Sequence, residues 1–290
     1  MDTQPADSTD VPAPTVCVRH PDRPTGLRCS RCDRPACPEC LRPASVGQHC
    51  VDCVAEGRRT VRRPVTISGA RADRKPVVVS VLIAVNVIVF VITAVQSGSV
   101  MDLSHSLLYA EWGLSPQFTA HGYWYQLVTA GFLHVNPIHI LMNMFALYII
   151  GRDMERILGP TRFTAVYLVG LLGGSVAVLL FGASDGFTVG ASGAVFALMG
   201  GLLVIVYRLK LNPGQVIGMI VINLVISVAI PGISLLGHVG GLVTGGLLTA
   251  ALVYAPAQRR AQWQVGAVAV LVAVLVGLTL IRFGQIPAFT

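Results

Sequence analysis

Apolar stretches recur along this chain after residue 75, and they constrain its fold more than any other feature. The stretches cover residues 76–95, 137–151, 163–182, 188–207, 214–231, 234–254 and 264–282. A helix rises 1.5 Å per residue, so about 20 apolar residues cross roughly 30 Å of hydrocarbon. The second stretch is short for a crossing, and we expect the segment LVTAGFLHVNP before it to lie at the interface or to re-enter the bilayer partly. The pattern predicts an all-α polytopic membrane protein.

The composition agrees with a membrane environment, and the placement of charge indicates an orientation. Hydrophobic residues make up 53% of the chain and charged residues only 12%, with a mean hydropathy of +0.68, which is far from the composition of soluble domains. Lys and Arg gather before the first stretch and in every second connection, whereas the long connection 97–136 has neither. Basic residues at helix ends are retained in the cytoplasm. We therefore predict a multi-pass protein of the cell membrane with a cytoplasmic N-terminus.

A second region precedes the membrane stretches and contains all seven cysteines. Its candidate metal ligands form four pairs, each separated by two residues: Cys17 with His20, Cys29 with Cys32, Cys37 with Cys40, and Cys50 with Cys53. Eight thiolate and imidazole ligands suit two tetrahedral Zn²⁺ sites. The odd number of cysteines, the histidine in the pattern and the cytoplasmic location disfavour a disulfide framework. We expect two structural zinc ions here and no cofactor for catalysis.

The sequence does not decide which two pairs of ligands share a metal ion. The pattern resembles small cross-braced zinc fingers of the B-box kind, and this resemblance implies that the first and third pairs hold one ion while the second and fourth hold the other. Sequential pairing is also compatible with the spacing, and His49 is an alternative ligand in the last pair. With few apolar residues to bury, the region is expected to need metal for folding and to act as a docking module for a protein partner.

Two polar residues in the membrane stretches are candidates for catalysis, because polar groups inside a bilayer are costly. Ser192, in the sequence Gly-Ala-Ser-Gly, opens the fourth stretch, and His238 opens the sixth. Both stretches begin on the same side of the membrane, so the two side chains lie at similar depth, as a nucleophile and its base require. Small residues recur every four positions on both stretches and allow close approach: Gly193, Ala197 and Gly201 on the fourth, and Gly241 and Gly245 on the sixth. Each residue alone is explained as well by bonding or packing within helices, but the pair favours catalysis.

These motifs resemble those of the rhomboid proteases. The sequence GASG around Ser192 is similar to that family's GxSG motif, GHVGG with Gly245 is similar to its HxGGxxxG motif, and His139 with Asn143 is similar to its HxxxN segment. The resemblance implies that Ser192 is the nucleophile and His238 the general base of a dyad without an aspartate. It also implies that His139 and Asn143 donate hydrogen bonds to the oxyanion.

The resemblance covers about residues 76–255 and suggests a domain organisation. We expect a disordered lead at residues 1–15, a zinc-binding domain at 16–54, a basic linker at 55–75, a six-helix rhomboid core at 76–255, and an added C-terminal transmembrane helix within 256–290. The linker either lies on anionic headgroups or serves only as a topology signal. Phe196 stands where the family often has a tyrosine stacked on the base, and residues 214–231 correspond to the family's gate for substrates.

The expected function is therefore that of an intramembrane serine endopeptidase with its active site toward the outer face. It would hydrolyse peptide bonds in or near the transmembrane segments of membrane-protein substrates. The implied partners are these substrates and the lipid bilayer, and no nucleic acid is expected. The alternative is an inactive, rhomboid-like protein that binds or traffics membrane proteins, which the intact Ser192 and His238 disfavour.

Overall fold

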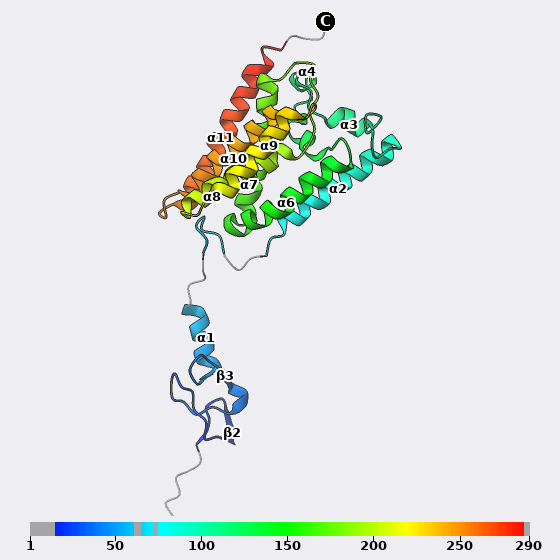
Figure 1. Ribbon diagram of the computed structural model, residues 1–290. Coiled ribbons are helices and arrows are strands. Elements are labelled where there is room, and N and C mark those ends of the chain that lie inside the picture. The colour runs from blue at the N-terminus through cyan, green and yellow to red at the C-terminus, as the bar shows by residue number, and fades with distance from the viewer. Residues whose placement is uncertain (1–14, 61–64, 72–74, 287–290) are drawn as a thin grey trace, which may run out of the picture. The chain divides into compact units, whose positions relative to one another are not determined.

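The structure is a computed structural model that describes residues 15–60, 65–71 and 75–286. The chain divides into two compact units, Met1–Arg63 and Pro64–Thr290 (Figure 1). Apart from Thr15, the expected lead lies outside the described residues, as do residues 61–64 and 72–74 of the expected linker.

The N-terminal unit consists of two short hairpins, a 3-10 turn and one helix. Strand β1 (Val16–Cys17) pairs with β2 (His20–Pro24), and β3 (Leu41–Pro43) pairs with β4 (Gln48–Cys50), both antiparallel; η1 (Pro38–Cys40) precedes β3, and α1 (Val51–Thr60) follows β4. The buried side chains are six cysteines together with Ala36 and Leu41. Such a core has too little apolar surface to offset a backbone entropy of about 1–2 kcal/mol per residue. Apolar burial alone therefore does not account for the stability of this unit.

Each of the seven apolar stretches forms a helix in the second unit. These helices are α2 (Val78–Ser97), α6 (Pro137–Leu158), α7 (Pro160–Phe181), α8 (Ser192–Arg208), α9 (Gly214–Ala229), α10 (Leu235–Val253) and α11 (Arg260–Phe283). The connection between α2 and α6 contains α3 (Leu107–Trp112), α4 (Pro116–Ala120), α5 (Gln126–Thr129) and the 3-10 turn η2 (Ala130–Phe132). Within the described part of the chain, α2, α7, α10 and α11 are long and apolar enough to cross a membrane, and the segment of α5 and η2 meets α6 at a bend of 95°. The predicted all-α polytopic fold is confirmed.

Local sequence signals set the ends of the helices that carry the site. The Asn136 side chain accepts a hydrogen bond from the His139 N–H, and Pro137 opens α6 at a position where its missing N–H costs nothing. Ser234 caps α10 in the same way. Gly159, with φ of 77°, ends α6 and lets α7 follow directly.

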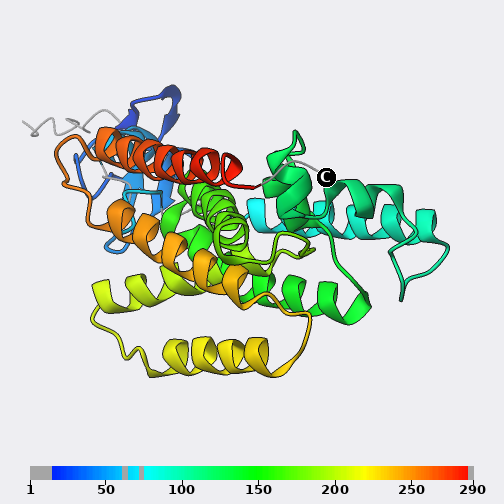
Figure 2. The same ribbon diagram turned by 90° about the horizontal axis from the view of Figure 1, so that it is seen from above.

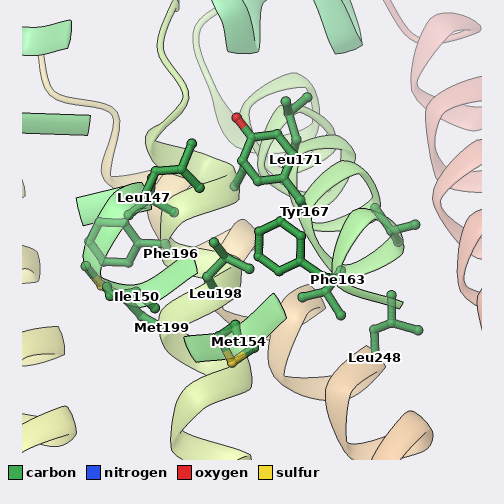
Figure 3. Packing of buried hydrophobic residues seen from close by; sticks show 14 of the residues in the cluster. Leu147, Ile150, Met154, Phe163, Tyr167, Leu171, Phe196, Leu198, Met199 and Leu248 are labelled. Atoms are coloured by element: carbon green, nitrogen blue, oxygen red, sulfur yellow. The ribbon is translucent and has the colours of Figure 1, made fainter. Parts of the chain in front are cut away.

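Helix α8 is the centre of the membrane unit, and α9 lies at its edge. Helix α8 packs against α6, α7 and α10, and its residues from Ala194 to Gly201 are all buried. Figure 3 shows Phe196 and Leu198 of α8 among aromatic and aliphatic side chains of the neighbouring helices. By contrast, α9 buries only Ile220 and Ser227, and Figure 2 shows it at the margin of the bundle. Most of the α9 surface is therefore free of helix contacts.

A buried carboxylate joins α6 to the start of α2. Glu155 accepts hydrogen bonds from the backbone N–H groups of Val77, Val78 and Val79 at 2.8, 3.0 and 2.9 Å. The first turn of a helix leaves such donors without partners, and a negative charge is favourable at that end. Glu155 therefore has a structural role.

Candidate active site and metal centres

The loop before α8 holds Ser192 at the first position of that helix. Leu114 and Thr188 exchange backbone hydrogen bonds of 3.0 and 2.9 Å, and the Gly190 N–H donates to a carbonyl of η2 at 2.9 Å. Gly190 has φ of 132°, a conformation that favours glycine. A Cβ at this position would lie 2.7 Å from the His139 imidazole and 3.7 Å from Ser192 Oγ. Both side chains are therefore close to the backbone of Gly190.

Ser192 and His238 face each other from α8 and α10. Ser192 Oγ lies 2.7 Å from His238 Nε2, which is a hydrogen-bonding distance. Phe196, one turn after Ser192, stacks on the imidazole with the ring centroids 4.1 Å apart and the planes at 11°. His238 is only 6% exposed. The stacked phenyl ring therefore shields one face of the imidazole and restricts its rotation.

Glycines allow α8 and α10 to approach this closely. A Cβ on Gly241 would overlap the carbonyl group of Gly193, and a Cβ on Gly245 would overlap the backbone of Ala197. Small residues at such spacing let the backbones of two membrane helices touch. Contact at successive turns fixes the register of the two helices, and the register sets the distance between the serine and the histidine.

A serine of α9 contacts the other nitrogen of the same imidazole. Ser227 Oγ lies 2.6 Å from His238 Nδ1, and the Ser227 hydroxyl also bonds the carbonyl of Asn223 at 2.7 Å. Ser227 does not stand out in the sequence, because a serine in an apolar helix commonly bonds the carbonyl four residues earlier and needs no other partner. The available signal was the pair of polar side chains, Asn223 and Ser227, in an otherwise apolar run.

His139 and Asn143 lie one turn apart near the start of α6. The Nδ1 atom of His139 accepts a hydrogen bond from the Val135 N–H at 3.4 Å, and the His139 ring packs edge-on against buried His134 at a centroid distance of 5.0 Å. The Asn143 amide donates to the His139 carbonyl at 2.9 Å. The structure therefore brings His139 close to Ser192, whereas the hydrogen bond of Asn143 is made within its own helix.

A small hollow of about 30 Å³ opens beside Ser192. Its wall consists largely of small residues, among them Ala130, Gly131, Gly174 and Gly190. A cavity of this volume has room for one or two water molecules. The hollow thus offers space for a water molecule next to the Ser192 hydroxyl.

The eight expected metal ligands gather into two groups in the N-terminal unit. Cys17, His20, Cys37 and Cys40 form one group, and Cys29, Cys32, Cys50 and Cys53 form the other, with the ligand atoms of each group within 4.8 Å of one another. The first and third pairs therefore meet, as do the second and fourth. Neither group contains His49, and all seven cysteines are free thiols.

The distances within these groups fit a tetrahedral metal ion. The Sγ atoms of Cys32 and Cys50 are 3.7 Å apart, and His20 Nδ1 lies 3.4 Å from Cys37 Sγ. Zn–S bonds of about 2.3 Å in tetrahedral geometry place two sulfur atoms roughly 3.8 Å apart. Three sulfur ligands with one imidazole, as in the first group, and four sulfur ligands, as in the second, are both donor sets of structural zinc sites. Both groups can therefore hold zinc.

The thiols of each group ionise unequally. Hydrogen bonding to the backbone of Cys37 lowers the pKa of the Cys17 thiol to about 6, whereas other thiols are hindered from ionising. Hydrogen bonding to Cys32, together with burial, raises the pKa of the Cys53 thiol to about 12. Burial and hydrogen bonding to Cys37 raise the pKa of the Cys40 thiol to about 11. A divalent cation reverses this effect, because thiols that coordinate a metal are deprotonated. The electrostatics of both groups thus favour a bound cation.

Known proteins resemble the membrane unit. The Rhomboid domain matches residues 121–256. "Rhomboid protease GluP" of Bacillus subtilis (strain 168) is 32% identical over 183 residues, which are 61% of this chain and 35% of that protein. "RHOMBOID-like protein 4" of Arabidopsis thaliana is 36% identical over 138 residues, which are 46% of this chain and 35% of that protein. This chain therefore spans about a third of the length of these two relatives.

Another relative is matched over most of its length. YdcA of Bacillus subtilis (strain 168), whose name includes "rhomboid protease", is 30% identical over 135 residues, which are 45% of this chain and 68% of that protein. The Rhomboid domain match contains His139, Asn143, Ser192 and His238 and extends past the end of α10. With its several apolar membrane helices, this chain belongs to the rhomboid family of multi-pass membrane proteins.

Proposed function

We propose that this chain is an intramembrane serine endopeptidase that hydrolyses peptide bonds in or near the transmembrane segments of membrane-protein substrates. The observation that carries the proposal is the distance of 2.7 Å between Ser192 Oγ and His238 Nε2. A hydroxyl within hydrogen-bond reach of an imidazole is the arrangement that activates serine for acyl transfer. Membership of a family whose relatives are named as rhomboid proteases supports the same reaction.

All the proton transfers of the proposed reaction pass through one nitrogen, Nε2 of His238. Ser192 Oγ attacks the carbonyl carbon of the scissile peptide bond while its proton passes to His238 Nε2. The tetrahedral intermediate collapses, the C–N bond breaks, and Nε2 returns the proton to the leaving amine. Water, deprotonated by the same nitrogen, then attacks the acyl-enzyme. The bond between the acyl carbon and Ser192 Oγ breaks, Nε2 returns the proton to Oγ, and the carboxyl product leaves. Phe196, stacked on the ring, keeps the imidazole plane in place.

The oxyanion of the intermediate needs donors aimed at it. The backbone N–H of Ser192 is one, since it belongs to the first turn of α8, whose N–H groups have no partner within the helix. The His139 imidazole, beside Gly190, is a second. Asn143 is a third through the amide hydrogen that it does not donate to its own helix. The hollow beside Ser192 has room for the water molecule that attacks the acyl-enzyme.

Labelling of the purified full chain by a fluorophosphonate probe in detergent tests the dyad. We expect the wild type to be labelled and both Ser192→Ala and His238→Ala to remain unlabelled, with Ser104→Ala, a change in an exposed loop, labelled like the wild type. Cleavage of a co-expressed single-span substrate should be lost equally in either single variant and in the double variant, because groups that act as a unit are not additive. Labelling of Ser192→Ala would exclude this nucleophile, and a folded wild type that is not labelled would favour the non-catalytic alternative.

We also propose that the N-terminal unit, with its metal-binding domain at residues 16–54, holds two structural zinc ions. The two groups of four ligands support this assignment, and four protein ligands leave no open position for chemistry at the metal. Metal analysis of the full chain should give two zinc ions per chain. A count of one, or iron in place of zinc, would contradict the proposal.

The proposed location is the cell membrane, with the N-terminal unit in the cytoplasm and the Ser192 end of α8 toward the outer face. The asymmetric placement of Lys and Arg supports this orientation. Added protease should cut the N-terminal unit in inverted membrane vesicles and leave it intact in right-side-out vesicles. Cleavage only in the right-side-out vesicles would reverse the topology.

A further inference from the structure

The imidazole of His238 has two ring nitrogens, and the proposed dyad uses only one of them. Ser192 Oγ lies 2.7 Å from Nε2, and Ser227 Oγ lies 2.6 Å from Nδ1. We propose that Ser227 is a positioning residue, which holds His238 in the ring orientation and tautomer that the reaction needs. The inference rests on the proposed function of Ser192 and His238.

One placement of the hydrogen atoms satisfies every hydrogen bond around the His238 ring. Nε2 must carry no hydrogen in order to accept the proton of Ser192, so the ring hydrogen is on Nδ1. Nδ1–H then donates to Ser227 Oγ, and the Ser227 hydroxyl donates to the Asn223 carbonyl at 2.7 Å. In the opposite tautomer, Nδ1 and the Asn223 carbonyl would compete for the single hydrogen of Ser227. The contacts on α9 therefore favour the tautomer in which Nε2 is the base.

Burial increases the effect of this contact. Ser227 is 5% exposed and His238 is 6% exposed, so water cannot readily replace a lost partner at Nδ1. An N–H that is buried without an acceptor is destabilised by the loss of its hydration. When Nε2 takes the proton of Ser192, the ring becomes positively charged and the bond from Nδ1–H to Ser227 becomes stronger. Ser227 therefore stabilises the transition state more than the resting state, and its effect falls on rate and not on binding.

The position of Ser227 makes the orientation of the base depend on α9. Ser227 and Ile220 are the only buried residues of this helix, which lies at the margin of the bundle (Figure 2). A displacement of α9 away from α10 separates Ser227 from Nδ1. Helix α9 must therefore be seated against the bundle for His238 to be oriented.

The kinetics of labelling by a fluorophosphonate probe test the inference on the full chain in detergent. A series of probe concentrations separates the maximal labelling rate from the half-saturating concentration. Ser227→Thr keeps the hydroxyl, whereas Ser227→Val has a methyl group in its place. Threonine and valine have the same shape, so the two variants differ in hydrogen bonding alone. We expect Ser227→Val to lower the maximal rate about 10- to 100-fold, as for a lost hydrogen bond to a charged group, with an unchanged half-saturating concentration. Ser227→Thr should stay close to the wild type.

Thr279→Val in α11 is the matched control, because it removes a buried hydroxyl that bonds only its own helix, at 2.8 Å from the Leu275 carbonyl. It should leave the labelling rate unchanged. Equal maximal rates for Ser227→Thr and Ser227→Val, at wild-type melting temperatures, would overturn the inference. So would an effect confined to the half-saturating concentration.

A second measurement decides the matter if the valine variant is unstable. This measurement is ¹⁵N NMR of wild type labelled at its histidines, in which the His238 signal is identified by its loss in His238→Gln. A ring hydrogen on Nδ1 supports the inference. A ring hydrogen on Nε2 overturns it. A wild type that the probe does not label refutes the proposed dyad instead, while the NMR result still reports on Ser227.

Discussion

A methyl group at Gly241 would enter space that the backbone of α8 occupies. The Cβ of Gly241→Ala would lie 2.8 Å from the carbonyl carbon of Gly193 and 3.1 Å from its Cα. Non-bonded carbon atoms rest about 3.5–4.0 Å apart. Backbone atoms cannot rotate aside as the end of a side chain can, so α8 and α10 must separate by roughly 1 Å to restore this contact distance.

The separation should affect stability and catalysis together. Overpacking of a close contact costs typically about 1–3 kcal/mol, which lowers the melting temperature. Ser192 adjoins Gly193 in the chain, so a shift of roughly 1 Å would lengthen the 2.7 Å contact between Ser192 Oγ and His238 Nε2 beyond hydrogen-bonding distance. A misplacement of this size costs about 100-fold in rate. We expect Gly241→Ala to reduce fluorophosphonate labelling by about that factor.

Labelling rates and thermal melting in detergent measure the two effects on the same sample. Gly277→Ala in α11 is the matched control, because nothing lies within 4 Å of a Cβ at that position. Alanine is the better helix former by up to about 1 kcal/mol, so this variant should keep its labelling rate and melt at the same or a higher temperature. If Gly241→Ala kept both the wild-type rate and the wild-type melting temperature, backbone contact between α8 and α10 would not set the distance between the serine and the histidine.

Three further predictions concern the other parts of the chain. Asn143→Ala should lower kcat on a single-span substrate about 10²- to 10³-fold, as for a lost oxyanion donor, with little change in KM or melting temperature; a parallel loss of stability would make Asn143 structural. Glu155→Gln turns an amide N–H toward the backbone donors of α2 and should destabilise the protein by about 1.5–3 kcal/mol, visible as a lower melting temperature, and an unchanged value would contradict the role of this carboxylate. Cys17→Ser with Cys37→Ser should leave one zinc ion that withstands a chelator, whereas Cys17→Ser with Cys29→Ser should leave none; the reverse result would indicate sequential pairing.

Hydropathy was sufficient to predict the seven long helices of the membrane unit, but not the short helices α1, α3, α4 and α5. Every apolar stretch forms a helix, because hydropathy and helix length depend on residues close together in the chain. Some observed helix ends differ from the expected ends. The stretch expected at 188–207 begins as a helix only at Ser192, because Gly190 has φ of 132° and cannot be part of a helix. The α5–η2 segment meets α6 at 95°. The second stretch was expected to end at residue 151, but α6 continues to Leu158 through charged residues that end the hydropathy signal.

The pairing of distant groups depended on the tertiary structure. Each Cys-x2-Cys or Cys-x2-His pair is a local feature, but the path of the hairpins decides which pairs meet, and it brings Cys17 to Cys37 and not to Cys29. Motif and depth predicted Ser192 and His238 as partners, yet the contact of Ser227 with His238 Nδ1 has no counterpart in the linear pattern. Periodicity and hydropathy describe the environment that each segment prefers. A contact between side chains of two helices depends on how all the helices pack, and that packing is a property of the whole chain.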